Sequence, residues 1–177
     1  MPPRDAALAA TTAAQAGQEH FERLGCSTCH VGTIVTAAPG TVIHDGLFTV
    51  PEALGNKITH PYSDFLLHGI ETGDGIVQAG PQDTANKLRT SPLWGLRMKP
   101  RFMHDLKSFS LQNAIERHGG EAEYVRLRFQ ELSPRAEARI VLFPQFFVIR
   151  TFLAERPAIR VTGSNRCPSL PFLPAAA

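Results

Sequence analysis

The sequence predicts a helical domain with long loops and an irregular C-terminal end. Three stretches, 13–24, 111–117 and 121–132, carry apolar residues at helical spacing, a capping residue or a terminating glycine. With 177 residues, 43% of them hydrophobic, the chain can form one real core, so we expect one domain. The net charge of +2 and the pI near 8.6 give no electrostatic reason to expect a nucleic-acid partner.

The first predicted helix leads directly into the most informative residues of the chain. Phe21 and Leu24 lie three positions apart, as on one helix face, and Gly25 is a typical helix-ending residue. Beyond the following motif, residues 31–46 contain a proline and glycines and show no helical period. We expect a loop there.

Cys26, Cys29 and His30 form Cys-x-x-Cys-His, the spacing at which a protein attaches haem covalently. Two thiols about one helical turn apart can reach the two vinyl groups at one porphyrin edge. His30 then meets the iron with one imidazole nitrogen, and we expect its other ring nitrogen to donate to a backbone carbonyl. The motif predicts one covalently bound haem c with His30 as axial ligand.

Two other roles for the thiols remain open at this point. A Cys-x-x-Cys pair can be half of a zinc site, but the third cysteine, Cys167, stands alone, so zinc would need histidines from elsewhere. A thioredoxin-like dithiol would need a strand before it and a βαβ context after it. Haem attachment is the favoured interpretation.

One further helix is expected in the middle of the chain and two in its second half. Residues 62–68 predict two helical turns with Phe65 and Leu66 facing inward, ended by Gly69. Ser110 is expected to cap the helix over 111–117. The apolar positions expected in the next helix, 121–132, are Val125, Leu127, Phe129 and Leu132.

The order of motifs resembles a known family. The haem motif is followed by the segments HPYSDFLLH, RTSPLWGLR, RFMHD and AIERHGGEA. Together they resemble the C-terminal haem domain of the bacterial di-haem oxidoreductases, relatives of di-haem cytochrome c peroxidase, over residues 16–133. The resemblance implies an all-α, cytochrome c-like haem domain, a periplasmic setting and electron transfer between two haems.

The resemblance also suggests a sixth iron ligand. Met103 matches the position of a methionine that can close the sixth coordination site in the peroxidase relatives, where a thioether would raise the haem potential. Met98, a histidine such as His104, or an open site are the alternatives, and Met103 could instead fill the core beside Phe102.

Three more residues are expected close to the haem. Trp94 is predicted to pack on the porphyrin or in the core, with its N–H donating to an acceptor. Arg97 and Arg101 flank it and could pair with a haem propionate, although a solvated surface role fits them equally well.

Three departures from the family pattern limit the transfer of function, and one of them is that the similarity fades near Ser133. The chain holds one Cys-x-x-Cys-His, so a di-haem enzyme would need a second haem domain or a redox partner protein. Leu106 replaces a glycine of the family motif, and we expect its turn to be either strained or rerouted. The sequence therefore predicts an electron-transfer module of a periplasmic oxidoreductase or, alternatively, the catalytic half of a peroxidase-like enzyme whose sixth iron position is open or can be opened.

The two ends of the chain are expected to differ from the haem domain. We expect a linker over 1–15, the cytochrome domain over 16–133, and a divergent helix with a proline-rich tail over 134–177, where a changed reading frame is one hypothesis. Residues 1–16 lack an apolar export segment, so we expect either that a leader lies upstream or that the chain is a piece of a longer protein. The apolar run 140–154 is too short and too interrupted to predict a membrane span.

Overall fold

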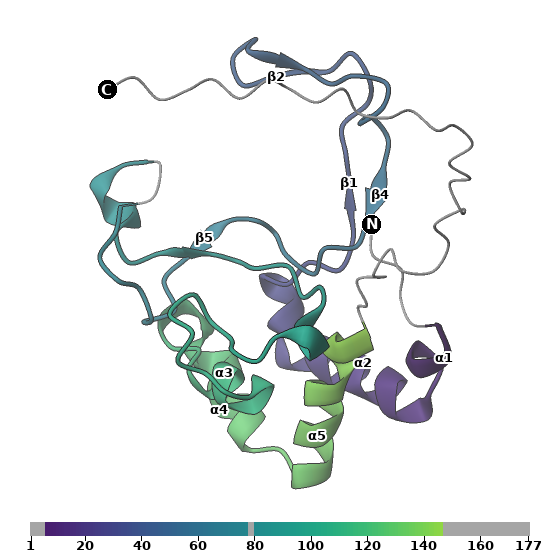
Figure 1. The fold of residues 1–177 in the computed structure, drawn as a ribbon, viewed down its shortest axis with the longest axis vertical. Helices are drawn as coiled ribbons and strands as arrows, with labels where there is room; N and C mark the ends of the chain where they lie inside the picture. The colour runs from purple at the N-terminus through teal and green to yellow at the C-terminus, as the bar shows by residue number, and fades with distance from the viewer. Residues whose placement is uncertain (1–5, 78–79, 147–177) are drawn as a thin grey trace, which may run out of the picture.

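A computed structural model describes residues 6–77 and 80–146 of the chain. Its helical body is built from five α-helices within those residues (Figure 1): α1 Ala6–Ala9, α2 Thr12–Leu24, α3 Leu111–Glu116, α4 Glu123–Gln130 and α5 Pro134–Leu142. The predicted stretch 13–24 is therefore confirmed as a helix, and so is the Ser110 cap, whose hydroxyl accepts from the Asn113 N–H at 3.0 Å.

The crossing of α2 and α5 forms the centre of the body. A Cβ built on Gly17 would lie 2.2 Å from the Arg139 carbonyl oxygen, so only glycine permits this approach. Beside the crossing, the rings of Phe21, Tyr62 and Phe143 pack together, with ring centroids 5.2 to 6.4 Å apart. These contacts join residues from the first, middle and last parts of the described chain into one core.

A second core cluster lies on the other side of Cys26 and consists of Leu24, Phe129 and Ile140. Phe129 is 1% exposed, as expected for an inward position, and Val125 and Leu132 pack against the cluster. Leu127, the remaining apolar position of this helix, is instead 46% exposed. In α4 the helical rotation that buries Phe129 carries Leu127 toward solvent.

The all-α expectation is wrong, because the structure is a mixed α/β fold. Three two-stranded antiparallel sheets lie in the described segments between the helices. They pair β1 Ile34–Val35 with β4 Ile58–Thr59, β2 Val42–Ile43 with β3 Phe48–Thr49, and β5 Leu67–His68 with β6 Leu88–Arg89. The paired positions are rich in β-branched residues, which favour the extended backbone of a strand.

The β2–β3 hairpin explains why residues 31–46 are not a plain loop. Its turn places Asp45 and Gly46 at φ 51° and 90°, and the Leu47 N–H donates to the His44 carbonyl at 2.9 Å. Asp-Gly between two β-branched or aromatic pairs is a strong hairpin signal, because both residues tolerate positive φ. The same signal is readable in the sequence.

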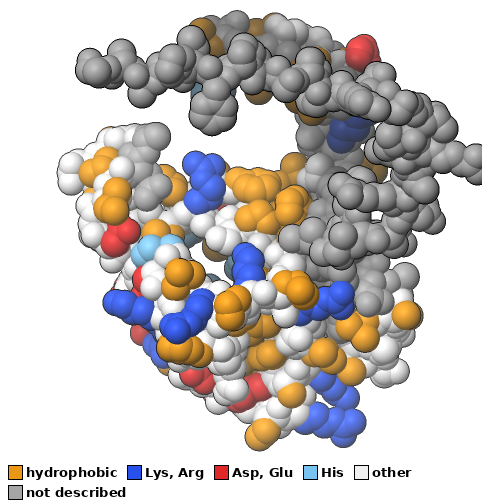
Figure 2. All heavy atoms as spheres, viewed as in Figure 1, with side chains coloured by type: hydrophobic (Ala, Val, Ile, Leu, Met, Phe, Trp, Pro, Cys, Tyr) orange, Lys and Arg blue, Asp and Glu red, His pale blue; other side chains and the backbone are white. Residues whose placement is uncertain are grey.

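The two sheets over residues 34–59 form an arm that extends away from the helices, with β1 and β4 side by side and β2 at its far end (Figure 1). Much of the arm's apolar surface is exposed. Over the helical part, Figure 2 shows hydrophobic side chains interspersed with Lys and Arg. The large hydrophobic side chains exposed on the arm are Val35, Val42, Ile43, Leu47, Phe48, Leu54 and Ile58.

The helix expected over 62–68 is absent, and the segment is extended. Tyr62 and Phe65 have φ of 52° and 59°, which interrupts a right-handed helix twice. The Ser63 hydroxyl accepts from the Phe65 N–H, and the Asp64 carboxylate accepts from the Leu66 N–H. Such side-chain bonds to the next backbone groups compete with helical ones. Phe65 and Leu66 accordingly are 39% and 61% exposed.

The segment from 134 onward begins as a packed helix. Pro134 occupies the first turn of α5, where its missing N–H costs nothing, and α5 lies against α2. The expected proline-rich tail and Cys167 fall outside the described residues. Among the helices that the structure describes, none combines the length and apolar character needed to cross a bilayer.

Candidate haem site

The Cys-x-x-Cys-His motif forms a tight turn at the end of α2. Gly25 ends the helix at φ 101°, and residues Cys26–Thr28 continue as a short 3-10 helix. The backbone N–H groups of Cys29 and His30 both donate to the Cys26 carbonyl. The two cysteines therefore lie one turn apart, as double attachment to one porphyrin edge requires.

His30 is held in the orientation expected of an axial ligand. Its ring Nδ1 donates to the Tyr62 carbonyl oxygen at 2.9 Å, so Nε2 keeps its lone pair. Burial lowers the pKa of His30, which favours the neutral imidazole that a metal needs. The Phe21 ring packs 6.1 Å from the imidazole, centroid to centroid, and supports it from the core.

The chemistry of the two thiols differs from that of a redox dithiol. Burial raises the pKa of Cys26 to about 11. The pKa of Cys29 is raised as well, first by burial and then by the nearby carboxylates of Asp64 and Glu121. Reactive dithiols instead have lowered thiol pKa values, because the thiolate is the nucleophile. This environment favours a structural or attachment role for both sulfurs.

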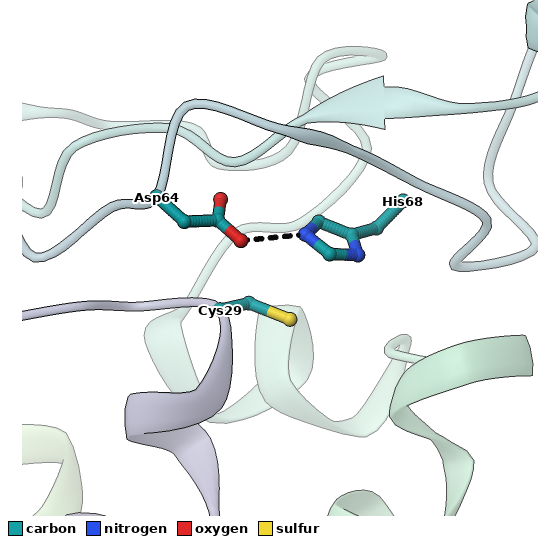
Figure 3. Close-up of side chains that lie close together, drawn as sticks. All are labelled: Cys29, Asp64 and His68. Atoms are coloured by element: carbon teal, nitrogen blue, oxygen red, sulfur yellow. Dashed lines mark hydrogen bonds and ion pairs between the residues drawn. The ribbon is translucent and has the colours of Figure 1, made fainter.

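A polar cluster lies directly against Cys29 and is not evident from the sequence (Figure 3). His68 Nε2 lies 2.8 Å from an Asp64 carboxylate oxygen, and its Nδ1 lies 2.9 Å from Glu121 Oε2. Together the two carboxylates outweigh burial and raise the pKa of His68. The Asp64 N–H donates to the Cys29 carbonyl at 2.8 Å, which fixes the cluster beside the motif.

Trp94 and Arg97 follow the strand β6 and occupy different environments. The Trp94 indole N–H donates to the His60 carbonyl at 2.8 Å, and its ring is half-buried against the aromatic core of Phe21, Tyr62 and Phe143. Arg97 lies in the 3-10 helix Leu96–Met98 and is exposed. Within that helix Met98 is 72% exposed.

Met103 is carried by a turn that is closed by backbone and side-chain contacts. Phe102 and Ser108 form an antiparallel bridge around it, and Arg117 holds Asp105 with two hydrogen bonds of 2.6 and 3.1 Å. The Arg117 guanidinium keeps the pKa of Asp105 far below its usual range. Met103 itself is half-buried, with φ of 65°.

The same turn contains the predicted strain and the second arginine. Leu106 has φ of 56°, in the left-handed region that glycine adopts easily. Arg101 donates to the Leu106 carbonyl at 3.4 Å, and its guanidinium carbon lies 3.8 Å from the centroid of the Phe109 ring. Arg101 thus contributes to the turn through a cation–π contact.

A family model decides the identity. The model described as "Di-haem oxidoreductase, putative peroxidase" matches residues 2–146. The chain belongs to this di-haem oxidoreductase family. The resemblance seen in the order of motifs is thereby confirmed, and the matched region includes α5. A search of curated proteins found no match to the chain.

Membership of a di-haem oxidoreductase family implies haem binding and oxidoreductase chemistry. The residues present fit that cofactor. His30 offers an unprotonated Nε2 at the end of a turn that carries two thiols, and its Nδ1–H is bonded to a backbone carbonyl, as is usual for metal-ligating histidines. The Cys-x-x-Cys-His motif, read from the sequence, therefore forms a sterically coherent site.

Proposed function

We propose that this chain binds one haem c through thioether bonds from Cys26 and Cys29, with His30 as axial ligand, and transfers electrons within a periplasmic oxidoreductase. The observation that carries the proposal is the His30 imidazole, whose Nδ1 donates to the Tyr62 carbonyl and whose Nε2 is left available. The family description supports the oxidoreductase part.

When bound, haem supplies the one-electron chemistry, and the chain supplies ligation and burial. The hydrogen bond to Tyr62 fixes the His30 ring and raises the basicity of Nε2. Phe21, Tyr62 and Phe143 pack behind the ligand and exclude water from that side. Lower water access reduces the reorganisation that accompanies electron transfer.

We further propose Met103 as the sixth iron ligand. Its turn is pinned to the end of α3 by the Arg117–Asp105 pair, which holds the backbone that carries the thioether. Met98 is a poorer candidate because its side chain is 72% exposed. Trp94, Arg97 and Arg101 are proposed to lie near the haem, with the two arginines as candidates to pair with its propionates.

The electron partner is proposed to be a second haem domain or a separate redox protein. The family description names two haems, and this sequence contains one Cys-x-x-Cys-His. Covalent haem attachment is expected on the outer side of the bacterial cytoplasmic membrane, which is the basis for proposing the periplasm.

A second function, the catalytic half of a peroxidase-like enzyme, is favoured by the family description. The two functions differ at the sixth coordination position. An electron-transfer site with Met103 bound should take up cyanide or carbon monoxide slowly, whereas an open site should bind them readily. Ligand-binding spectra of the wild type compared with those of Met103→Ala, with exposed Met98→Ala as the matched control, distinguish the two: only a bound Met103 makes the variant faster than the wild type.

The first experiment is a haem stain on a denaturing gel, after expression with an added periplasmic leader in a host that matures c-type cytochromes. A stained band is expected for the full chain and is expected to be lost when Cys26 and Cys29 are both replaced by serine. His30→Ala is expected to abolish the low-spin spectrum. Folded protein that takes up no stain would contradict the proposal.

A further inference from the structure

The polar cluster beside Cys29 has the composition of a metal site. The donor atoms of Cys29, Asp64 and His68 all lie within 4.8 Å of one another. Figure 3 shows the Cys29 sulfur directed toward the space next to the Asp64–His68 pair. We propose that the chain, while its thiols are free, binds a divalent transition-metal ion through these three side chains, and that zinc is the ion that suits them best.

The donor set suits zinc in type and in spacing. Thiolate sulfur, imidazole nitrogen and carboxylate oxygen are the protein ligands of zinc, at about 2.0 to 2.3 Å from the ion. Tetrahedral angles then place neighbouring donors roughly 3.3 to 3.8 Å apart. His68 Nε2 and the Asp64 oxygen, now 2.8 Å apart, need to separate slightly, and the sulfur needs to approach them by at most about 1.5 Å.

Glu121 gives the cluster an outer shell of the kind found around metal-bound histidines. It accepts from His68 Nδ1 at 2.9 Å, so Nε2 faces Asp64 and the sulfur. A carboxylate behind a ligating imidazole fixes its tautomer and strengthens the metal bond. The second oxygen of Glu121 accepts from the Gly69 N–H at 2.8 Å, which holds the carboxylate in place.

The backbone brings the three donors together before any ion arrives. The Asp64 N–H donates to the Cys29 carbonyl at 2.8 Å, and Asp64 and His68 lie on one extended segment. The side chains of Asp64 and His68 are 13% and 18% exposed, so an ion can reach them. Three protein ligands leave a fourth position for water.

The nearby charges also favour a cation. Asp64 and Glu121 raise the pKa of the Cys29 thiol, after burial itself, because they disfavour a second negative charge. A bound cation reverses that effect and deprotonates the thiol. Binding is therefore expected to release at least the thiol proton.

The inference goes beyond the proposed haem function, with which it shares the Cys29 sulfur. A thioether carries no charge and is a far weaker zinc ligand than a thiolate, so haem attachment at Cys29 and zinc binding exclude one another. The cluster is therefore expected to bind zinc when Cys29 is a free thiol, and not when Cys29 carries haem.

The test is calorimetric titration of the reduced, haem-free full chain with zinc, in a Cys167→Ser background so that the third thiol cannot contribute. One ion per chain is expected, with release of at least one proton, measured from the heats in two buffers. Cobalt added in place of zinc should give sulfur-to-metal charge-transfer absorption. Cys29→Ser and His68→Ala should each weaken binding more than about 100-fold, and Glu121→Gln about 10- to 100-fold.

Cys26→Ser is the matched control, since it removes the other thiol of the motif, and it should leave affinity within about threefold. Circular dichroism checks that each variant folds like the parent chain. Equal zinc affinity in the Cys29→Ser and Cys26→Ser variants, or loss of binding only in Cys26→Ser, would overturn the inference, as would absence of binding in the folded parent. These readings use haem-free protein, so they stay separate from any failure of haem attachment.

Discussion

Leu106 offers a direct test of backbone strain in the turn that carries Met103. Its φ of 56° lies in the left-handed region, where a Cβ crowds the backbone. Comparing wild type with a glycine variant would mix this effect with loss of a side chain that is 57% exposed. The variants Leu106→Ala and Leu106→Gly both lack that side chain beyond Cβ, so their difference isolates the backbone effect.

The expected difference follows from two opposing contributions. Left-handed backbone costs a residue with a Cβ about 1–2 kcal/mol, and glycine avoids this cost. Glycine's extra freedom in the unfolded chain offsets roughly 0.5–1 kcal/mol of this gain. Leu106→Gly is therefore expected to be more stable than Leu106→Ala by about 1 kcal/mol. Urea unfolding followed by circular dichroism measures both free energies of unfolding.

Gln112 in α3 supplies the matched control at an exposed helical position. There Gln112→Gly should be less stable than Gln112→Ala, again by about 1 kcal/mol, because alanine favours a helix. The two positions thus predict opposite orders. Backbone strain at Leu106 is refuted if Leu106→Ala is as stable as Leu106→Gly, or more stable, while the variants of Gln112 behave as stated.

Other predictions concern the core and the polar cluster. Gly17→Ala should lower the free energy of unfolding by about 1–3 kcal/mol or more, since its Cβ would meet backbone at 2.2 Å; an unchanged urea midpoint would contradict the close crossing. Phe129→Ala should cost about 3–5 kcal/mol, measured in the same way, because the ring is 1% exposed; a loss below 1 kcal/mol would speak against that burial. His68, whose pKa is raised, should stabilise the fold below its ordinary value of 6.5 and lose this contribution as pH rises through its folded pKa. Asp64 and Glu121, whose pKa values are lowered, lose theirs on acidification below about 4, so the stability gap between wild type and His68→Ala should be widest near pH 5 to 6 and should narrow on both sides.

Local signals in the sequence predicted much of the helical body. The Ser110 cap and the glycine after Leu24 each act on a few neighbouring residues, and the structure has both helix ends where these signals predict them. The hairpin at Asp45-Gly46 was also readable, but its short strands carry no long alternating pattern. Strands of two residues gain their order from pairing partners more than from periodicity.

The polar cluster could not be predicted from local pattern. The apolar run Phe65-Leu66-Leu67 reads as a helix, and a helix would have put Asp64 and His68 one turn apart without explaining Glu121. The positive φ of Tyr62 and Phe65 and the Asp64 bond to the Cys29 carbonyl depend on packing across distant segments. The motif predicted haem as the cofactor, which membership of the family supports, whereas tertiary contacts determine what surrounds the motif.

The aromatic core has a consequence for the order in which the chain can fold when it enters its compartment N-terminus first. Phe143 completes a cluster whose other members, Ala14, Phe21 and Tyr62, come from the first half of the described chain. The rings of Phe21 and Tyr62 therefore stay uncovered until Phe143, directly after α5, has entered, and closure must wait for contacts of long sequence separation. Chaperones of that compartment that bind exposed aromatic segments would have their longest opportunity in that interval.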